Sequence, residues 1–391
     1  MNEDYLVFQV GKATTYVRKS CLSRLKNADA AIFDCDGVLI DTRESYRKCI
    51  LETVKYFLRA LACIEPPDDK ILREATYRLK RSGGFNNDWD AAYALLLFLF
   101  SKTSASFQAE FISLTSAKQF EEKSVRARLD YVKTSLRHKP SGFSLDPDEI
   151  VTELLQFATR VDDSGTRSAE RELEISVEML SAVKRFLNYP DSVKESPLAI
   201  VFDEMFYGSK LFSDTHGVER QFYFGPGFVE IEKERTLVTC ETVKELAMAL
   251  GRENFGIVSG RDRLSAKFSL GCVLDMFAKK AVIFLMDVNY EEEEDEEKKR
   301  LRKPDPYCLI KASKGLEPFN YSLYVGDSAE DMIMVKRANE ENPRFISVGV
   351  YSLSDFKEEL VSYFLDMRTD VILYSIKELP FLLYKVKAQD L

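Results

Sequence analysis

A short apolar run, which we expect to form a strand over residues 30–34, leads into two aspartates, Asp34 and Asp36, and then a glycine. A brief apolar run that stops at a glycine turn is typical of a strand buried within a sheet. Such a strand would bring two carboxylates, two positions apart, to its carboxyl end. Magnesium binds carboxylate oxygens, and a carboxylate can attack a phosphorus atom. The segment therefore predicts a site for phosphoryl chemistry.

Three further polar motifs follow later in the chain, with the sequences Ser259-Gly260-Arg261, Lys303-Pro304 and Gly326-Asp327-Ser328-Ala329-Glu330-Asp331. Ser259 and the turn amides beside it would bind an anionic oxygen. Lys303 offers a cation on a backbone that the next proline restricts. Asp327 and Asp331 lie four positions apart at the expected start of a helix and add two more carboxylates.

In this order, the motifs Asp-x-Asp-Gly, Ser-Gly-Arg, Lys-Pro and Gly-Asp-x-x-x-Asp resemble the four signature motifs of the haloacid dehalogenase superfamily. The chain resembles in particular the phosphatase branch that carries a helical cap after the first motif, similar to subfamily IA. The resemblance implies a Rossmann-like α/β core, a phosphatase activity and Mg²⁺ as the cofactor.

The resemblance also implies roles for the residues that handle the phosphoryl group. Asp34 would be the nucleophile that forms an aspartyl phosphate. Asp36 would protonate the leaving oxygen and later deprotonate the attacking water. Ser259, the amide of Gly260 and Lys303 would hold the phosphoryl oxygens, where negative charge needs stabilisation.

A second set of implied roles concerns the metal ion. Magnesium would bind Asp34, the main-chain carbonyl of Asp36, and Asp327. Asp331 would act through water or by orienting Lys303. All of these groups would lie outside the carboxyl ends of the parallel strands, where such sheets bind ligands.

The distribution of apolar runs predicts the domain organisation. After residue 254 apolar runs alternate with helical patterns, which favours a doubly wound parallel sheet with crossover helices; the runs are 255–258, 281–286, 321–325, 344–349 and 371–375. The strand at 30–34 belongs to the same sheet, although about 200 residues separate it from the next, far more than a crossover requires. We therefore expect a core of 1–42 and 241–391, with a β-hairpin in its first 20 residues, and a mainly helical cap domain at 43–240.

Within the predicted cap, the segment Gly83-Gly84-Phe85-Asn86-Asn87-Asp88-Trp89 is unusual. One interpretation is a glycine turn, a helix cap and a buried tryptophan. The other is a loop that contacts the substrate. Under the second interpretation, Asn86, Asn87 and Trp89 would bind the substrate.

Bulk properties exclude several classes of function. A formal net charge of -9 argues against a partner whose binding depends on neutralising nucleic-acid phosphates. The longest apolar run, at 91–100, is too short to span a membrane and should be a buried helix. Seven dispersed cysteines predict reduced thiols, and the first residues show no secretory pattern. We therefore expect a cytoplasmic protein.

These observations predict a magnesium-dependent phosphatase that hydrolyses a small phosphorylated metabolite, with phosphoglycolate as a substrate typical of capped relatives. Asp36 argues against dehalogenation, because the carbon–halogen hydrolases of the superfamily lack the second aspartate. Two alternatives stay open at this point: a phosphomutase or phosphotransferase that uses the same motifs, and a non-catalytic binding protein. The choice of ester and the oligomeric state stay open as well.

Overall fold

The computed structural model describes residues 4–10, 13–62, 64–85, 87–137, 142–231, 234–284 and 301–388. Asn86, one of the predicted substrate-binding residues, lies outside these ranges. The chain divides into two compact units. We call Met1–Thr42 with Glu234–Leu391 the sheet unit, and Arg43–Lys233 the helical unit. The predicted second boundary, at residue 240, falls inside the sheet unit.

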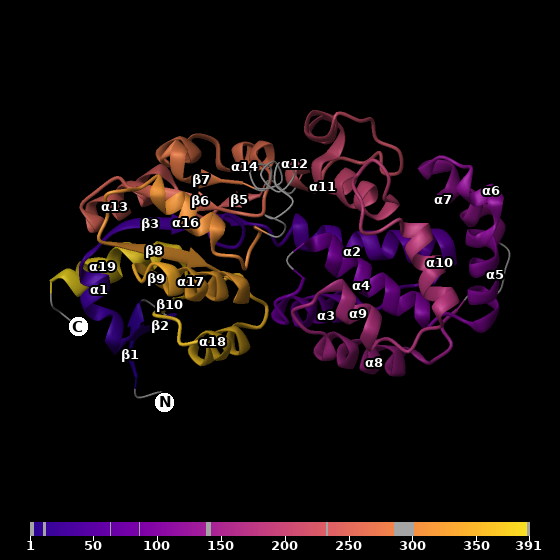
Figure 1. The fold of residues 1–391 in the computed structure, drawn as a ribbon, viewed down its shortest axis with the longest axis horizontal. Helices are drawn as coiled ribbons and strands as arrows, with labels where there is room; N and C mark the ends of the chain where they lie inside the picture. The colour runs from indigo at the N-terminus through magenta and orange to yellow at the C-terminus, as the bar shows by residue number, and fades with distance from the viewer. Residues whose placement is uncertain are drawn as a thin grey trace. The chain divides into compact units, whose positions relative to one another are not determined.

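An eight-stranded sheet with the order β1-β2-β10-β9-β8-β3-β6-β7 runs through the described part of the sheet unit (Figure 1). Its strands are β1 (Tyr5–Val10), β2 (Ala13–Arg18), β3 (Ala28–Phe33), β6 (Phe255–Val258), β7 (Val282–Ile283), β8 (Tyr321–Gly326), β9 (Phe345–Val350) and β10 (Val371–Leu373). The strands from β10 to β7 pair in parallel, and β1 and β2 form a hairpin that joins β10 antiparallel. The predicted α/β class with a parallel sheet is confirmed.

Helices cover both faces of this sheet; they are α1 (Leu22–Lys26), α13 (Cys240–Leu250), α14 (Arg263–Leu270), α16 (Tyr307–Lys314), α17 (Ala329–Glu341), α18 (Lys357–Asp366) and α19 (Leu379–Lys387). Alternate side chains of β3 point to opposite faces, as the pleat requires. Ala31 and Phe33 join one buried cluster with side chains of α13 and α19. Ala30 and Ile32 join another with α16 and α17. Burial on both faces explains why the strand is apolar throughout its second half.

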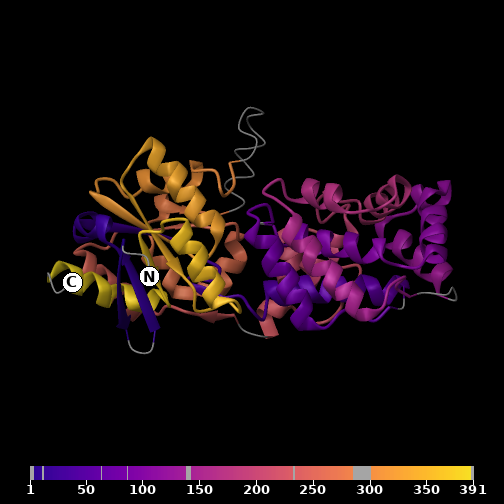
Figure 2. The same ribbon diagram turned by 90° about the horizontal axis from the view of Figure 1, so that it is seen from below.

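The helical unit consists of helices joined by loops, as Figure 1 and Figure 2 show. They are α2 (Tyr46–Phe57), α3 (Asp69–Arg81), α4 (Asp88–Ser101), α5 (Ala105–Ser116), α6 (Lys118–Glu121), α7 (Val125–Leu136), α8 (Pro147–Arg160), α9 (Thr166–Glu172), α10 (Val177–Leu187), α11 (Pro197–His216) and α12 (Phe228–Ile231), with a π-helical turn at Leu58–Ala62. The apolar run at 91–100 forms most of α4 and is buried on every side. Across the part of the chain that the structure describes, no helix combines the length and apolar character needed to cross a membrane.

Two short strands mark the place where the chain leaves the sheet unit and returns to it. β4 (Ile40–Asp41) pairs antiparallel with β5 (Arg235–Thr236), and the N–H of Leu237 donates to the carbonyl of Leu39 at 2.7 Å. We call this ribbon the stem. It ties the residues just after 234 to the sheet unit, which is why the boundary lies before β5 rather than at residue 240.

Candidate active site

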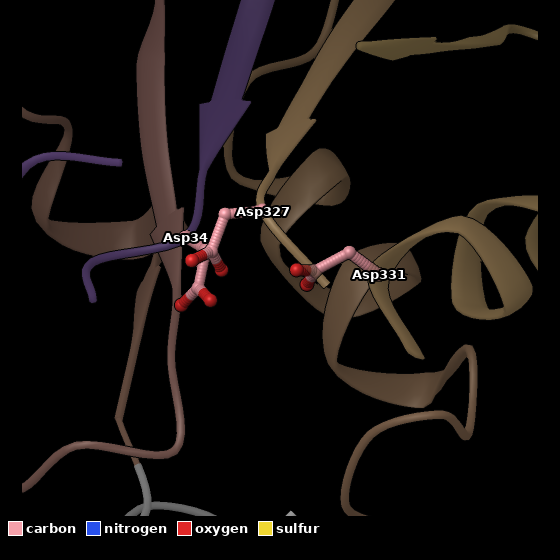
Figure 3. A group of neighbouring side chains, drawn as sticks. All are labelled: Asp34, Asp327 and Asp331. Atoms are coloured by element: carbon pink, nitrogen blue, oxygen red, sulfur yellow. The ribbon is translucent and has the colours of Figure 1, made fainter. Parts of the chain in front are cut away.

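The carboxyl ends of β3 and β8 form the floor of the site. The two strands are parallel neighbours, so the residues that follow them meet at one edge of the sheet. Asp34 follows β3, and its N–H donates to the carbonyl of Val325 on β8 at 2.8 Å. Asp327 follows β8 directly. One carboxylate oxygen from each of Asp34, Asp327 and Asp331 lies within 4.8 Å of the others (Figure 3).

Asp331 is held rigidly at the start of α17. Ser328 is the N-cap of this helix, and its N–H and hydroxyl donate to Oδ2 of Asp331 at 3.1 and 2.7 Å. The other oxygen, Oδ1, accepts hydrogen bonds from Lys303 and from the hydroxyl of Tyr324, both at 2.8 Å. Burial would raise the pKa of Asp331, but the charge of Lys303 and these hydrogen bonds outweigh it and lower the pKa below its usual value. Asp331 is therefore ionised and fixed.

Lys303 lies between two of the carboxylates. Its Nζ is 3.0 Å from Oδ1 of Asp34 and 2.8 Å from Oδ1 of Asp331, and only 12% of the side chain is exposed. Burial would lower the pKa of Lys303, but the charges of Asp331 and Asp34 outweigh it and raise the pKa well above its ordinary value. The lysine is therefore a permanent cation in the site.

Asp34 experiences the opposite balance. Its side chain is 13% exposed, and burial raises its pKa to about 8 despite the charge of Lys303, with Asp331 and Asp327 adding to the rise. The N–H of Cys35 donates to Oδ1 of Asp34 at 2.6 Å and helps to fix the carboxylate. The site is thus short of positive charge, and its oxygen donors fit a hard divalent cation such as Mg²⁺.

Gly37 lets the turn after β3 approach the cluster. Its φ is +77°, a conformation that glycine adopts without strain. A Cβ atom at this position would lie 1.9 Å from Oδ2 of Asp327, closer than any non-bonded contact permits. The glycine of the first motif is therefore required both by the backbone conformation and by the packing of the acidic cluster.

The second motif lies at the same edge of the sheet. β6 is the parallel neighbour of β3 on the other side, with Phe33 opposite Ile257. Ser259 and Gly260 therefore follow β6 as Asp34 follows β3. Ser259 is buried; its N–H donates to the carbonyl of Ile283 at 3.1 Å, and its hydroxyl accepts from the N–H of Arg261 at 3.3 Å.

Arg261 and Glu234 are site residues to which the sequence analysis gave no role. The guanidinium of Arg261 has no exposed surface, and its Nη1 donates to Oδ1 of Asp36 at 2.6 Å. Its Nη2 donates to Oε2 of Glu234, whose side chain is also buried. The position of Arg261 directly after Ser-Gly was a signal that could have identified it. No local signal marks Glu234, which is far from Asp36 in sequence.

The predicted substrate residues of the cap belong to the helical unit. Asn87 is the N-cap of α4, and its Oδ1 accepts from the N–H of Trp89 at 3.0 Å. The indole N–H of Trp89 donates to Oδ1 of Asp203 at 2.9 Å. Both residues thus make contacts inside their own unit, and their predicted role in substrate binding stays a prediction.

Comparison with known proteins extends the description of the fold. No family model and no curated protein matches the chain. The X-ray structure of a Northeast Structural Genomics Consortium target resembles it with a TM-score of 0.62 at 17% identity, over 92% of this chain and 99% of that one. Phosphatase Tt82 from Thermococcus thioreducens gives a TM-score of 0.46 at 21% identity, over 85% of this chain and 97% of that one. The first likeness shows that a solved protein shares this α/β fold over most of the chain.

Proposed function

We propose that the protein is a magnesium-dependent phosphatase that hydrolyses a small phosphomonoester through an aspartyl phosphate on Asp34. The observation that carries the proposal is the enclosure of the Asp34 carboxylate, which lies beside the cation of Lys303 and within 4.8 Å of the Asp327 and Asp331 oxygens. The resemblance of the four motifs to those of the haloacid dehalogenase superfamily supports the same conclusion. Phosphoglycolate is the first ester to test.

The reaction would proceed in two displacements. In the first, an Asp34 oxygen forms a bond to phosphorus while the bond to the ester oxygen breaks, and Asp36 gives a proton to the departing oxygen. In the second, water attacks the same phosphorus, Asp36 takes a proton from that water, and the bond to Asp34 breaks. Ser259, the Gly260 amide and Lys303 would hold the phosphoryl oxygens during both steps.

Asp34, Asp327 and the main-chain carbonyl of Asp36 would hold the magnesium ion. When bound, this ion would offset the charge of the nucleophile and of the phosphoryl group, which otherwise repel each other. Both oxygens of Asp331 accept hydrogen bonds from protein groups. Asp331 would therefore act by orienting Lys303 rather than as a direct ligand.

Phosphate release from a panel of small esters, with magnesium or with EDTA, tests the proposal. Turnover should require magnesium and vanish in Asp34→Asn, and acid-quenched mass spectrometry should find a phosphoryl group on the peptide that contains Asp34 in the native protein. Asp29→Asn is the matched control, because Asp29 lies at the opposite end of the same strand. It should keep full activity.

The proposed hydrolase activity would be overturned if the native protein were folded and as inactive as Asp34→Asn. Transfer of the phosphoryl group to a sugar phosphate rather than to water would identify a phosphomutase. Absence of turnover with either acceptor would leave a binding protein.

A further inference from the structure

Arg261 is enclosed by groups that use its hydrogen-bond donors on several sides. Nη1 donates to Asp36, Nη2 to Glu234 and, at 3.4 Å, to Ser269, and Nε to the hydroxyl of Ser265 at 3.1 Å. The side chains of Arg261 and Glu234 are 0% and 1% exposed. Ser269 also donates to Glu234, so the second carboxylate is held by two groups.

A buried guanidinium always carries its charge, and removing that charge from water is costly unless it is well paired. Here two carboxylates flank it, and its planar fork sets the direction of each hydrogen bond. Glu234 and the serines come from the stem side and from α14, so they fix Arg261 independently of Asp36. The arginine is therefore a rigid support on which Asp36 rests.

Asp36 itself stands on the glycine turn after β3 and keeps 31% of its side chain exposed. Its carboxylate is thus partly exposed to solvent and accepts a hydrogen bond from Arg261. The fully enclosed guanidinium offers no surface to a substrate, so Arg261 can act on the reaction only through neighbouring groups, and its Nη1 donates to Asp36, the proposed acid and base. Proton transfer requires a carboxyl group at hydrogen-bond distance from a defined oxygen, and a free rotamer would rarely provide it.

We infer that Arg261 is a positioning residue that holds Asp36 for proton transfer, and that Glu234 holds Arg261 in turn. The inference rests on the proposed phosphatase reaction, in which Asp36 protonates the leaving oxygen. It adds a specific consequence. Loss of Arg261 should lower kcat/KM most for the esters whose leaving group most needs that proton.

Two esters separate this role from a general structural one. The leaving group of an alkyl ester such as phosphoglycolate is a basic alkoxide, which needs a proton as it departs. The leaving group of 4-nitrophenyl phosphate is a stable phenolate, which does not need one. The value of kcat/KM reports the steps up to departure of the leaving group, so the second role of Asp36, as base toward water, does not affect it. The ratio of the two kcat/KM values, alkyl over aryl, is the readout.

Arg261→Lys keeps the charge but loses the fork. It should lower kcat/KM for the alkyl ester by roughly 10- to 100-fold and that for the aryl ester by less than about threefold. Glu234→Gln should shift the ratio in the same direction by a smaller factor, and it carries the test if Arg261→Lys fails to fold. Asp36→Asn sets the limit, and adding Arg261→Lys to it should not change the ratio further. Arg252→Lys, a half-exposed arginine of the same unit that donates to the carbonyl of Pro318, should leave both values unchanged.

Equal losses of kcat/KM on both esters in folded variants would indicate a structural role for Arg261. They would overturn the inference but not the proposed phosphatase activity. A rise of KM alone on both esters would also overturn it, because it would place Arg261 in contact with the substrate anion. If the native protein with magnesium released phosphate from no ester of the panel, the proposed function would fail and the inference with it. If it released phosphate from other esters only, an alkyl and an aryl ester that it hydrolyses would replace these two.

Discussion

Replacing Asp331 by asparagine should destabilise the sheet unit more than any other isosteric change in the acidic cluster. Oδ1 faces the ammonium of Lys303, and Oδ2 faces the main-chain N–H of Ser328. Neither donor can be reversed, whereas the hydroxyls of Tyr324 and Ser328 can turn. An asparagine amide would therefore point its NH₂ group at a donor in either orientation.

The expected loss follows from these contacts. One charge-assisted hydrogen bond disappears, at about 1.5–3 kcal/mol, and an opposed buried donor adds about 1–3 kcal/mol. Breaking a buried ion pair costs about 3–5 kcal/mol, but Lys303 keeps Asp34 at 3.0 Å, so the lower end applies. We therefore expect Asp331→Asn to lower the free energy of unfolding of the sheet unit by about 3 kcal/mol. Asp327→Asn, the same chemical change in the same cluster, should lose less than about 1 kcal/mol, because it removes a like charge beside Asp34.

The assay must report on the correct unit. The single tryptophan, Trp89, belongs to the helical unit, so its fluorescence does not follow the sheet unit directly. Hydrogen exchange of the peptides that contain β3 and β8, measured in EDTA across a urea series, does so. The argument from fixed donors would be wrong if the free energy of unfolding of Asp331→Asn lay within about 1 kcal/mol of the native value. It would also be wrong if Asp327→Asn lowered that free energy as much as Asp331→Asn does.

Three further predictions concern other parts of the molecule. Gly37→Ala should destabilise the sheet unit by at least roughly 1–3 kcal/mol from its positive φ alone, and should abolish magnesium-dependent turnover because the new methyl group meets a carboxylate oxygen of the cluster; an alanine variant with native activity would contradict this. The sulfurs of Cys240 and Cys272 lie 3.5 Å apart, and Cys272 is exposed. Hydrogen peroxide should therefore oxidise the two thiols to a disulfide and be reduced to water, and thiol titration should then find two fewer thiols. If peroxide still removed two thiols after serine replacement of either cysteine, this pair would be excluded. Burial raises the pKa of Glu204 above 4.5, so the folded state binds this proton more tightly than the unfolded chain, and its contribution to stability is lost as pH rises from about 4.5. As pH rises above about 4.5, the native protein should therefore lose stability relative to Glu204→Gln, and urea unfolding followed by Trp89 fluorescence would reveal the loss. Stability curves that stay parallel would refute the assignment.

The meeting of Asp34, Asp327 and Asp331 could be predicted from the sequence, because it depends on local rules. Asp34 and Asp327 each follow an apolar run, Asp331 lies in the first turn of a helix, and parallel strands bring their carboxyl ends to one edge. The register of β3 beside β8 then completes the cluster. The predicted strands after residue 254 correspond to β6, β7, β8, β9 and β10 for the same reason; the end of the predicted run at 281–286 lies outside the described residues.

The support of Asp36 could not be predicted in this way. Arg261 lies 225 positions from Asp36 and 27 from Glu234, so the contacts depend on side-chain direction in the finished fold. The predicted boundary at residue 240 differs from the division of the chain before Glu234 for a related reason. β5 is only two residues long, and its pairing with β4, rather than its composition, assigns it to the sheet unit.

The stem has an evolutionary consequence. Because β4 and β5 are neighbours, the chain leaves the sheet unit after Asp41 and re-enters it before Arg235 at points about one strand spacing apart, roughly 5 Å. A segment whose ends lie so close can be lengthened, shortened or exchanged while the strands that carry Asp34 and Asp327 keep their register. The residues proposed to perform the chemistry all lie in the sheet unit. Selection can therefore remodel the helical unit, as a module grafted onto a two-stranded base, without rebuilding the acidic cluster.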